Sequence, residues 1–282
     1  MKLAHNGTCT MHSDVIGDVQ IAKASGYDAI EIVGSKLYRF LDQGFTVDDL
    51  NKELDGFPVV GLGFVPDIER NDAKGYKDLL AETEKMCDCA HKLGCGLVQL
   101  LTGPLFPDEA SVEYRQTVSL PYPELRKVAA DNLKVISDIG KNYDIKFYLE
   151  PLNWCPIASL PQMLELIDQT EKDNIGIVID FWHMWNTGAV AEDFAKLNKD
   201  IIYGVHICDS LEKHNERGTV ESLGRRVWTG GGNVPLKPWM DAIRSTGFDG
   251  WCSGELFSPK HWELEPYEVA KRLREYMEYL LV

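Results

Sequence analysis

Apolar segments of strand length recur eight times along the chain, and they constrain its fold more than any other feature. Their positions are 2–7, 29–34, 58–64, 96–103, 145–152, 175–183, 201–209 and 251–257. Stretches of helical length lie between them, such as 76–94 and 122–143, in which apolar residues recur at intervals of three and four. Strands that alternate with helices pair in parallel, because each crossover returns through a helix. The sequence therefore predicts an α/β protein with a parallel sheet.

A short repeat supports this alternation. Residues 24–32 (ASGYDAIEI) and 245–256 (STGFDGWCSGEL) both carry Gly-aromatic-Asp just before a strand-like segment. Glycine in this position ends a helix in the left-handed conformation and turns the chain toward the sheet. Eight strand–helix units in 282 residues predict a (β/α)8 TIM barrel, a fold of typically about 250 residues. The alternative is an open doubly wound sheet, but no G-x-G-x-x-G follows the first strand-like segment.

The composition narrows the class of protein and its partners. No linker or low-complexity tract divides the chain, so we expect residues 1–282 to form a single domain. The formal net charge of −15 repels nucleic acids and anionic membranes. The N-terminus has no apolar leader, and no run approaches the roughly 18 apolar residues that a membrane span needs. The seven cysteines are an odd number, which argues against a disulfide framework. We therefore expect a cytoplasmic protein that binds neither nucleic acid nor membranes.

Four consecutive strand-like segments end in, or carry near their ends, a side chain that binds metals. These residues are Glu150, Asp180, His206 and Glu255. In a TIM barrel the carboxyl ends of the strands meet at one rim, where active sites lie. Each residue alone has an ordinary explanation, because a buried carboxylate can cap a helix or pair with arginine and a lone histidine is usually a core residue. Three carboxylates at one rim, however, repel one another and raise their pKa values unless a cation neutralises them.

A single divalent cation would remove this repulsion. Three carboxylates and one imidazole suit Mn²⁺, Mg²⁺ or Co²⁺, as well as Zn²⁺, and leave coordination positions for substrate oxygens. Of these ions we expect Mn²⁺ first. Such an ion acts as a Lewis acid, and the arrangement suits proton transfer α to a carbonyl through a metal-stabilised enediolate. Glu150 and Glu255 would then serve as base and acid as well as ligands, and the sequence leaves open which is which.

The motifs around these residues form a pattern that resembles a known family. The chain contains E-P-x-N at 150–153, D-x-x-H at 180–183, V-H-x-x-D at 205–209 and G-E-L at 254–256. It is similar over nearly its whole length to the sugar phosphate isomerase/epimerase proteins of the xylose-isomerase-like TIM-barrel superfamily, which includes ketose 3-epimerases and inosose-processing enzymes. The resemblance implies a metal site formed by Glu150, Asp180, His206 and Glu255. It also implies substrate binding by His183 and Arg226.

The sequence differs from two groups of this superfamily, and these differences narrow the function that the resemblance implies. The family 2 AP endonucleases of the same superfamily need additional histidines from the third and fourth strands, whereas these segments end in GLGF and LLTG. A trinuclear phosphodiesterase site is therefore not expected. The ketose 3-epimerases usually place a second Glu shortly after the strand-five ligand, but this chain has NWCPIAS at 153–159. The sequence does not support a strict assignment as a 3-epimerase.

Three functions follow from these observations. The first is a metal-dependent isomerase or epimerase in carbohydrate metabolism, with a keto sugar or sugar derivative as its small-molecule substrate. The second is a lyase that dehydrates an inosose or cleaves a 3-keto-glycoside by β-elimination, with the same metal and Glu pair. The third is a barrel that binds a partner without catalysis, and the complete ligand set argues against it. Relatives of this kind are often dimers or tetramers, so the resemblance is compatible with a homo-oligomer.

Several aromatic and basic side chains near strand ends have two interpretations. Four indoles either form a platform for a sugar ring or pack in the interior: Trp154, Trp182, Trp228 and Trp262. Of these, Trp154 and Trp182 are the candidate substrate-binding residues. The loop 209–234 carries Arg217, Arg225 and Arg226, which either meet an anionic group or lie in a solvated loop. Because concentrated positive charge is scarce, an unphosphorylated keto sugar or glycoside is favoured over a sugar phosphate.

Two further polar residues lie in the first two strand-like segments. His5 is a lone histidine, and we expect a structural role for it. Glu31 either binds a substrate hydroxyl or forms an ion pair with Lys36 or Arg39, and we favour the ion pair.

Overall fold

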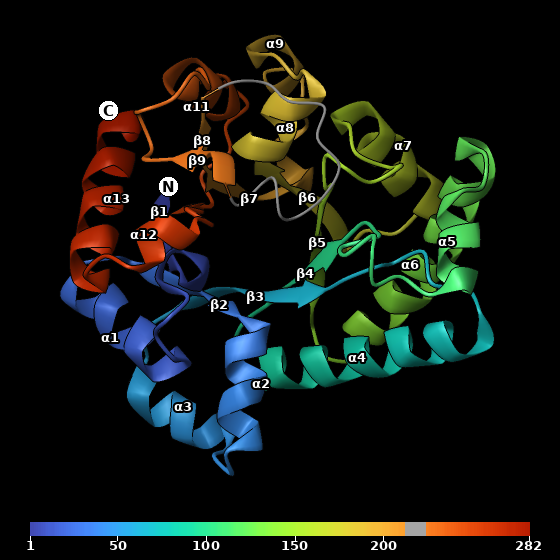
Figure 1. The fold of residues 1–282 in the computed structure, drawn as a ribbon, viewed down its shortest axis with the longest axis horizontal. Helices are drawn as coiled ribbons and strands as arrows, with labels where there is room; N and C mark the ends of the chain where they lie inside the picture. Colours follow the sequence, from blue (N-terminus) through green and yellow to red (C-terminus); the bar gives the residue numbers. More distant parts are fainter. Residues whose placement is uncertain (212–223) are drawn as a thin grey trace.

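The eight strand-like segments form a closed parallel barrel in a computed structural model, which describes residues 1–211 and 224–282 (Figure 1). The barrel strands are β1 (Lys2–Asn6), β2 (Ala29–Val33), β3 (Val59–Val65), β4 (Leu97–Leu101), β5 (Lys146–Glu150), β6 (Ile175–Asp180), β7 (Ile202–Ile207) and β10 (Trp251–Gly254). Each strand pairs with its neighbour along the chain, and β1 closes the barrel by pairing with both β2 and β10. The predicted α/β TIM barrel is confirmed.

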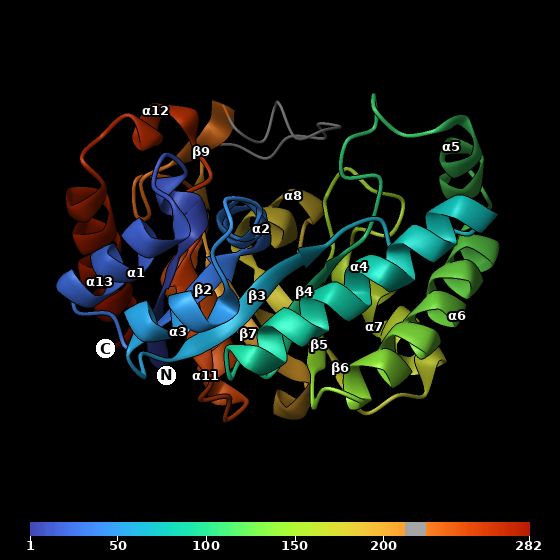
Figure 2. The same ribbon diagram turned by 90° about the horizontal axis from the view of Figure 1, so that it is seen from below.

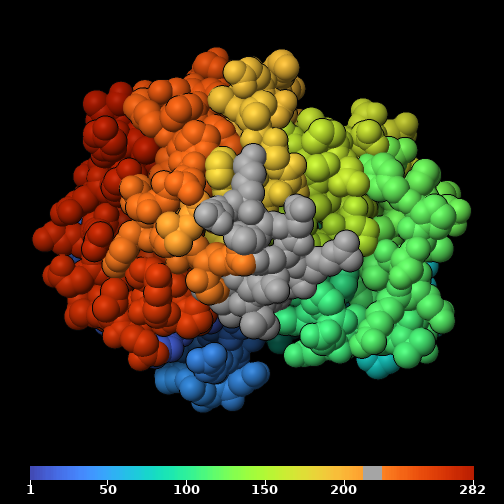
Figure 3. Space-filling model, turned by 45° about the horizontal axis from the view of Figure 1, so that its top comes forward, coloured from blue at the N-terminus to red at the C-terminus, as the bar shows by residue number. Residues whose placement is uncertain are grey.

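Helices surround the barrel and connect its strands (Figures 1 and 2). The longer ones are α1 (Val15–Ala24), α2 (Gly34–Asp42), α3 (Val47–Leu54), α4 (Ala73–Lys92), α6 (Tyr122–Lys141), α7 (Leu160–Thr170), α11 (Leu236–Ser245) and α13 (Pro266–Leu281). The predicted helical stretches 76–94 and 122–143 correspond to α4 and α6. Helix α13 packs against α1 and β1, so the last helix lies beside the first elements of the chain (Figure 1). In the space-filling view, the red C-terminal part of the chain meets the blue N-terminal part (Figure 3).

Shorter elements lie mostly in the connections around the site. They are the 3₁₀ helices η1 (Gly7–Thr10) and η2 (Lys199–Ile201), the helices α5 (Val112–Val118), α8 (Phe181–Thr187), α9 (Ala191–Phe194) and α12 (Pro259–Trp262), and the antiparallel pair β8 (Asp209–Ser210) and β9 (Arg226–Val227). In Figure 2, α8, α12 and β9 lie at the end of the barrel where the strands finish. Among the described residues, no helix is both long and apolar enough to cross a membrane.

The repeated Gly-aromatic-Asp segments form the helix ends that their sequence predicts. Gly26 follows α1 with φ of 77°, and Gly247 follows α11 with φ of 86°. Both lie in the left-handed region, which glycine occupies without a steric penalty. The chain then turns directly into β2 and β10. The repeat therefore sets the position at which each of these strands enters the barrel.

The largest part of the core lies between the barrel and its helices, and a smaller cluster lies inside the barrel. The inner cluster consists of Ala4, Ala29, Tyr148, Val178 and Trp251. The rings of Tyr148 and Trp251 lie 5.8 Å apart in an edge-to-face arrangement. Small residues make room for them, because a Cβ on Gly61 would lie 2.5 Å from the Tyr148 hydroxyl and one on Gly204 would lie 2.3 Å from the Trp251 ring. These two aromatic residues form the floor beneath the candidate site.

All seven cysteines are buried and free, and none of them forms a disulfide bond with another. Arg217 lies outside the described residues.

Candidate metal centre

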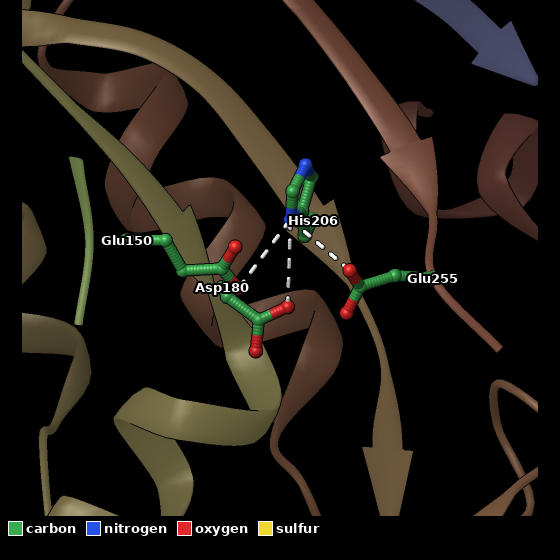
Figure 4. A group of neighbouring side chains, drawn as sticks. All are labelled: Glu150, Asp180, His206 and Glu255. Atoms are coloured by element: carbon green, nitrogen blue, oxygen red, sulfur yellow. Dashed lines mark ion pairs between the residues drawn. The ribbon is translucent and has the colours of Figure 1, made fainter. Parts of the chain in front are cut away.

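Four side chains from neighbouring strands converge at the carboxyl ends of the barrel (Figure 4). Glu150 ends β5, Asp180 ends β6, His206 lies in β7 and Glu255 follows β10 directly. The strand register places Asp180 opposite His206. His206 Nδ1 lies 3.7 Å from one carboxylate oxygen of each of the other three residues. The structure therefore brings together the four residues that the sequence predicts as metal ligands.

The geometry around His206 fits a cation better than it fits direct contacts. Nδ1 is buried and has no hydrogen-bond partner, and 3.7 Å is too long for a hydrogen bond to any of the three carboxylates. Metal bonds of about 2.0–2.2 Å hold two ligand atoms of a tetrahedral ion about 3.4 Å apart. An imidazole nitrogen without a partner that faces three carboxylates thus has the donor types and spacing of a divalent metal site.

Burial and mutual repulsion shift the pKa values in this cluster. Burial raises the pKa of Glu255 to about 8, and the charges of Glu150 and Asp180 act in the same direction against the opposing effect of Arg226. Burial alone would lower the pKa of His206, but the negative charges of Glu31 and Glu150 raise it well above its usual value. Protons thus compensate part of the negative charge when no cation does. Because a bound cation displaces such protons, metal affinity at a site of this kind depends on pH.

A cavity opens next to the four residues and contains about 740 Å³ of empty space, including its mouth. Glu150 and Glu255 lie in its wall. Apolar side chains form much of the remaining wall: Ile32, Val33, Phe64, Leu101, Leu105, Phe106, Leu152 and Phe257. The site therefore combines a few charged side chains with a largely apolar wall, which is the usual character of small-molecule sites.

Two of the predicted substrate-binding residues line this cavity beside Glu150. His183 Nε2 lies 3.6 Å from Glu150 Oε1, and the other ring nitrogen, Nδ1, accepts a hydrogen bond from the Asn153 backbone N–H at 3.1 Å. Trp154 packs edge-to-face against His183, with ring centroids 5.4 Å apart. Its indole N–H donates to the carbonyl of Pro104 at 3.1 Å. Both side chains are thus fixed by neighbours and present their remaining surface to the cavity.

The other two predicted substrate-binding residues form a support for Glu255. Arg226 Nη1 donates to Glu255 Oε2 at 2.7 Å and to the Glu255 carbonyl at 2.9 Å. The guanidinium group also lies over the Trp182 ring, 5.0 Å from its centroid. Arg226 lines the cavity, whereas the buried Trp182 does not. The structure thus places Trp182 beneath Arg226, away from the space that a substrate would occupy.

The remaining indoles do not form a platform in this cavity. Trp228 packs beneath the guanidinium group of Arg272, 4.0 Å away, and Trp262 donates to the carbonyl of Thr8 at 2.8 Å. Neither lines the cavity. His5 is buried, bonds to Thr10 through Nε2, and has its pKa lowered by burial to about 3, in agreement with a structural role.

The predicted ion pair of Glu31 is wrong. Lys36 pairs instead with Asp18 at 2.7 Å, and it also donates to the carbonyls of Gly7 and Thr10. The reason is that Lys36 lies in α2, after the chain has left the barrel, whereas Glu31 faces the barrel interior and bonds to residues of other strands.

Sequence reasoning also missed Gln99 in β4. Its amide donates to Glu150 Oε2, and it lines the cavity. Gln99 and Glu31 share one signal, since each is a single polar residue inside an otherwise apolar strand segment. Such residues must find polar partners inside the barrel, because a buried polar group without a hydrogen bond is costly.

Comparisons with known proteins relate the chain to enzymes of this architecture. The family model described as "Xylose isomerase-like TIM barrel" matches residues 19–280. An inosose isomerase of Halalkalibacterium halodurans is 27% identical over 98% of this chain and 94% of its own length. A probable ketose 3-epimerase of Synechocystis sp. is 25% identical over 87% of this chain and 79% of its own. The crystal structure of the IOLI protein with a binding zinc atom superposes with a TM-score of 0.88 at 25% identity, and covers 100% of this chain and 98% of its own.

Proposed function

Because the chain belongs to the xylose isomerase-like TIM barrel family, we propose that it is a divalent-metal-dependent isomerase or epimerase of a keto sugar or related keto compound. The observation that carries this proposal is His206 Nδ1, which has no hydrogen-bond partner and lies 3.7 Å from each of three carboxylates. Glu150, Asp180, His206 and Glu255 would hold the ion. Zinc is a candidate beside manganese, since zinc is the metal in the related IOLI structure.

The proposed reaction is proton transfer at the carbon next to a carbonyl. A divalent cation at this site supplies a Lewis acid that stabilises negative charge on the substrate oxygens. Glu150 and Glu255 approach the site from β5 and from the end of β10, on either side of β6 and β7 in the barrel. One carboxylate removes the α-proton and the other supplies a proton, as general acid–base catalysis requires. Arg226 holds Glu255 in position for this role through two hydrogen bonds.

The cavity wall favours an uncharged polyol with a carbonyl group. His183 would bind a substrate hydroxyl beside Glu150, and Trp154 would contact the ring of the sugar. Among the described lining residues, Arg226 is the only Lys or Arg, and it is already paired with Glu255. A substrate phosphate would therefore lack a free cationic partner there. The first substrates to assay are therefore inososes, ketoses and 3-keto-glycosides that carry no phosphate.

Exchange of the substrate α-proton with solvent deuterium tests this proposal directly. With the preferred substrate of the panel and Mn²⁺ or Zn²⁺ present, Glu150→Gln and Glu255→Gln should each reduce exchange by at least about 100-fold, because an amide neither accepts nor supplies the proton. Mass spectrometry or proton NMR follows the exchange. The exposed Glu192→Gln is the matched control and should exchange like the unchanged protein. Full exchange in both site variants would reject the roles of these carboxylates.

Product analysis in the same reactions separates the lyase alternative. An isomerase or epimerase returns a product of unchanged mass, whereas dehydration loses water and β-elimination releases an aglycone. Loss of either group would replace the proposed isomerisation with elimination at the same site.

A further inference from the structure

We infer that Glu31 is a positioning residue that fixes the tautomer of His206, so that the Nδ1 lone pair faces the cation. The inference deepens the proposed metal centre and rests on it. His206 Nε2 lies 3.0 Å from Glu31 Oε1, on the side of the ring opposite the three carboxylates. One ring nitrogen thus has a carboxylate acceptor at hydrogen-bond distance, and the other has no partner.

This division of the two ring nitrogens sets where the proton resides. A neutral imidazole carries one N–H, and the nitrogen with the stronger acceptor keeps it. The carboxylate of Glu31 therefore holds the proton on Nε2. The lone pair then lies on Nδ1, where Glu150, Asp180 and Glu255 also direct their oxygens. Without Glu31 both tautomers would be accessible, and one of them directs an N–H at the metal site.

Glu31 is itself held by three further donors. Tyr148 O–H donates to Oε1 at 2.8 Å. Asn6 Nδ2–H and Ser253 O–H donate to Oε2 at 2.7 and 2.8 Å. The strand register explains these contacts, because Asn6 lies opposite Glu31 and Ser253 lies opposite His206 in neighbouring strands. Four strands thus fix the position of one carboxylate.

Four groups that can donate hydrogen bonds surround the carboxylate of Glu31: Tyr148 O–H, Asn6 Nδ2–H, Ser253 O–H and His206 Nε2. An ionised carboxylate can only accept hydrogen bonds, and here all its neighbours can donate. The network is therefore consistent with one arrangement of protons, in which Nε2 of His206 is a donor.

Glu31→Gln changes this proton arrangement while nearly keeping the shape of the side chain. Asn6 and Ser253 both donate toward Oε2, so the amide oxygen should take that side and the NH₂ group should face His206 Nε2. That nitrogen would then have to accept, and the ring proton would move to Nδ1. We expect the affinity for Zn²⁺ or Mn²⁺, measured by calorimetry, to fall by about 10- to 100-fold, as is typical when the outer partner of a metal-binding histidine is lost.

Tyr148→Phe is the matched control, since Tyr148 and His206 donate to the same oxygen of Glu31. This variant removes one hydrogen bond but keeps the carboxylate beside His206, so metal affinity should change less than threefold. A purely structural role of the network predicts similar losses in Tyr148→Phe and Glu31→Gln, and that outcome would overturn the inference.

The ¹⁵N spectrum of histidine-labelled, zinc-loaded protein provides a readout that needs no variant of Glu31. We expect His206 to show a protonated Nε2 and a metal-bound Nδ1, with its signals assigned by their loss in His206→Gln. Nδ1 protonation would overturn the inference even if Glu31→Gln failed to fold, as would unchanged metal affinity in a folded Glu31→Gln. Failure of the unchanged protein to bind either metal would instead refute the metal centre itself.

Discussion

Asp180 uses its two carboxylate oxygens for different tasks. Oδ1 accepts the backbone N–H of His183 at 2.9 Å and so caps the start of α8. Oδ2 faces His206 Nδ1 at 3.7 Å. A strand that ends on Asp therefore both begins the next helix and supplies a candidate metal ligand. The cap also positions His183, which is the next candidate substrate-binding residue along the chain.

Glu69, which is not one of the candidate metal ligands, should make the stability of the folded protein depend on pH. Burial raises the pKa of its carboxyl group to about 8, and the charge of Asp67 acts in the same direction. Tyr114 O–H and the Gly103 N–H both donate to Oε2 at 3.0 Å, while the buried Oε1 has no hydrogen-bond partner. The folded protein therefore holds a proton on Glu69 at neutral pH, whereas the unfolded chain, with a carboxyl pKa near 4.5, does not.

The sign of this effect follows from proton linkage. Between pH 4.5 and about 8 the folded state binds more protons at Glu69, so its contribution to stability falls as the pH rises through this range. Glu69→Gln removes that dependence. The difference in free energy of unfolding between this variant and the unchanged protein should therefore shift in favour of the variant between pH 5 and 8.5, by on the order of a few kcal/mol. Urea denaturation at both pH values measures the gain, and equal pH profiles would contradict the prediction.

Close packing inside the barrel restricts which residues strand β3 can contain. A Cβ on Gly61 would lie 2.5 Å from the Tyr148 hydroxyl and 3.2 Å from the ring carbon that carries it. Gly61→Ala should therefore displace Tyr148 or β3 and lower the free energy of unfolding by about 1–3 kcal/mol, as overpacked cores do. Denaturant melts measure the loss. Gly96→Ala is the control, because a Cβ there meets nothing within 4 Å and its φ is not positive, and a similar loss in both variants would refute the packing argument.

The strand and helix pattern made the barrel and the four converging residues predictable, because both depend on order along the chain. Strand ends in a parallel barrel meet at one rim, so Glu150 and Glu255 could be placed together without coordinates. The partners of Glu31 could not be placed in this way. They come from β1, β5, β7 and β10, and only the register between strands that are distant in sequence sets those contacts.

Trp182 illustrates a second limit of prediction from sequence. It follows the strand end as closely as Asp180 and His183 do, but α8 begins at Phe181. Successive residues of a helix project about 100° apart, so neighbours in sequence face different surroundings. His183 faces the cavity, whereas Trp182 packs under Arg226. The position of Trp182 relative to the cavity could be predicted only if the residue at which this helix begins were known.

At the scale of the whole molecule, a bound cation would join four of the eight barrel strands, β5, β6, β7 and β10. Its four candidate ligands extend from Glu150 to Glu255, so metal binding to the folded state should stabilise the entire barrel. At a free metal concentration of about 100 times the dissociation constant the gain is about 2.7 kcal/mol, or roughly 5–10 °C in the midpoint of thermal unfolding. Differential scanning calorimetry with and without Zn²⁺ or Mn²⁺ measures this shift.

Asp180→Asn separates metal binding from capping in this experiment. Asparagine can still cap α8, but it removes one of the charges that face His206. We expect the metal-induced shift to fall to near zero in this variant and to persist in the exposed Asp48→Asn. An equal shift in Asp180→Asn would show that the metal binds elsewhere.

Tyr148 and Trp251 fill the interior of the barrel below the candidate site, so the cavity is closed on that side. The Trp251 ring lies 5.9 Å from that of His206, so the barrel axis is filled directly below the candidate metal centre. In the proposed reaction, substrate and product would therefore enter and leave through the same opening, and one would block the other. The product should consequently act as a purely competitive inhibitor, which initial rates at several product concentrations measure.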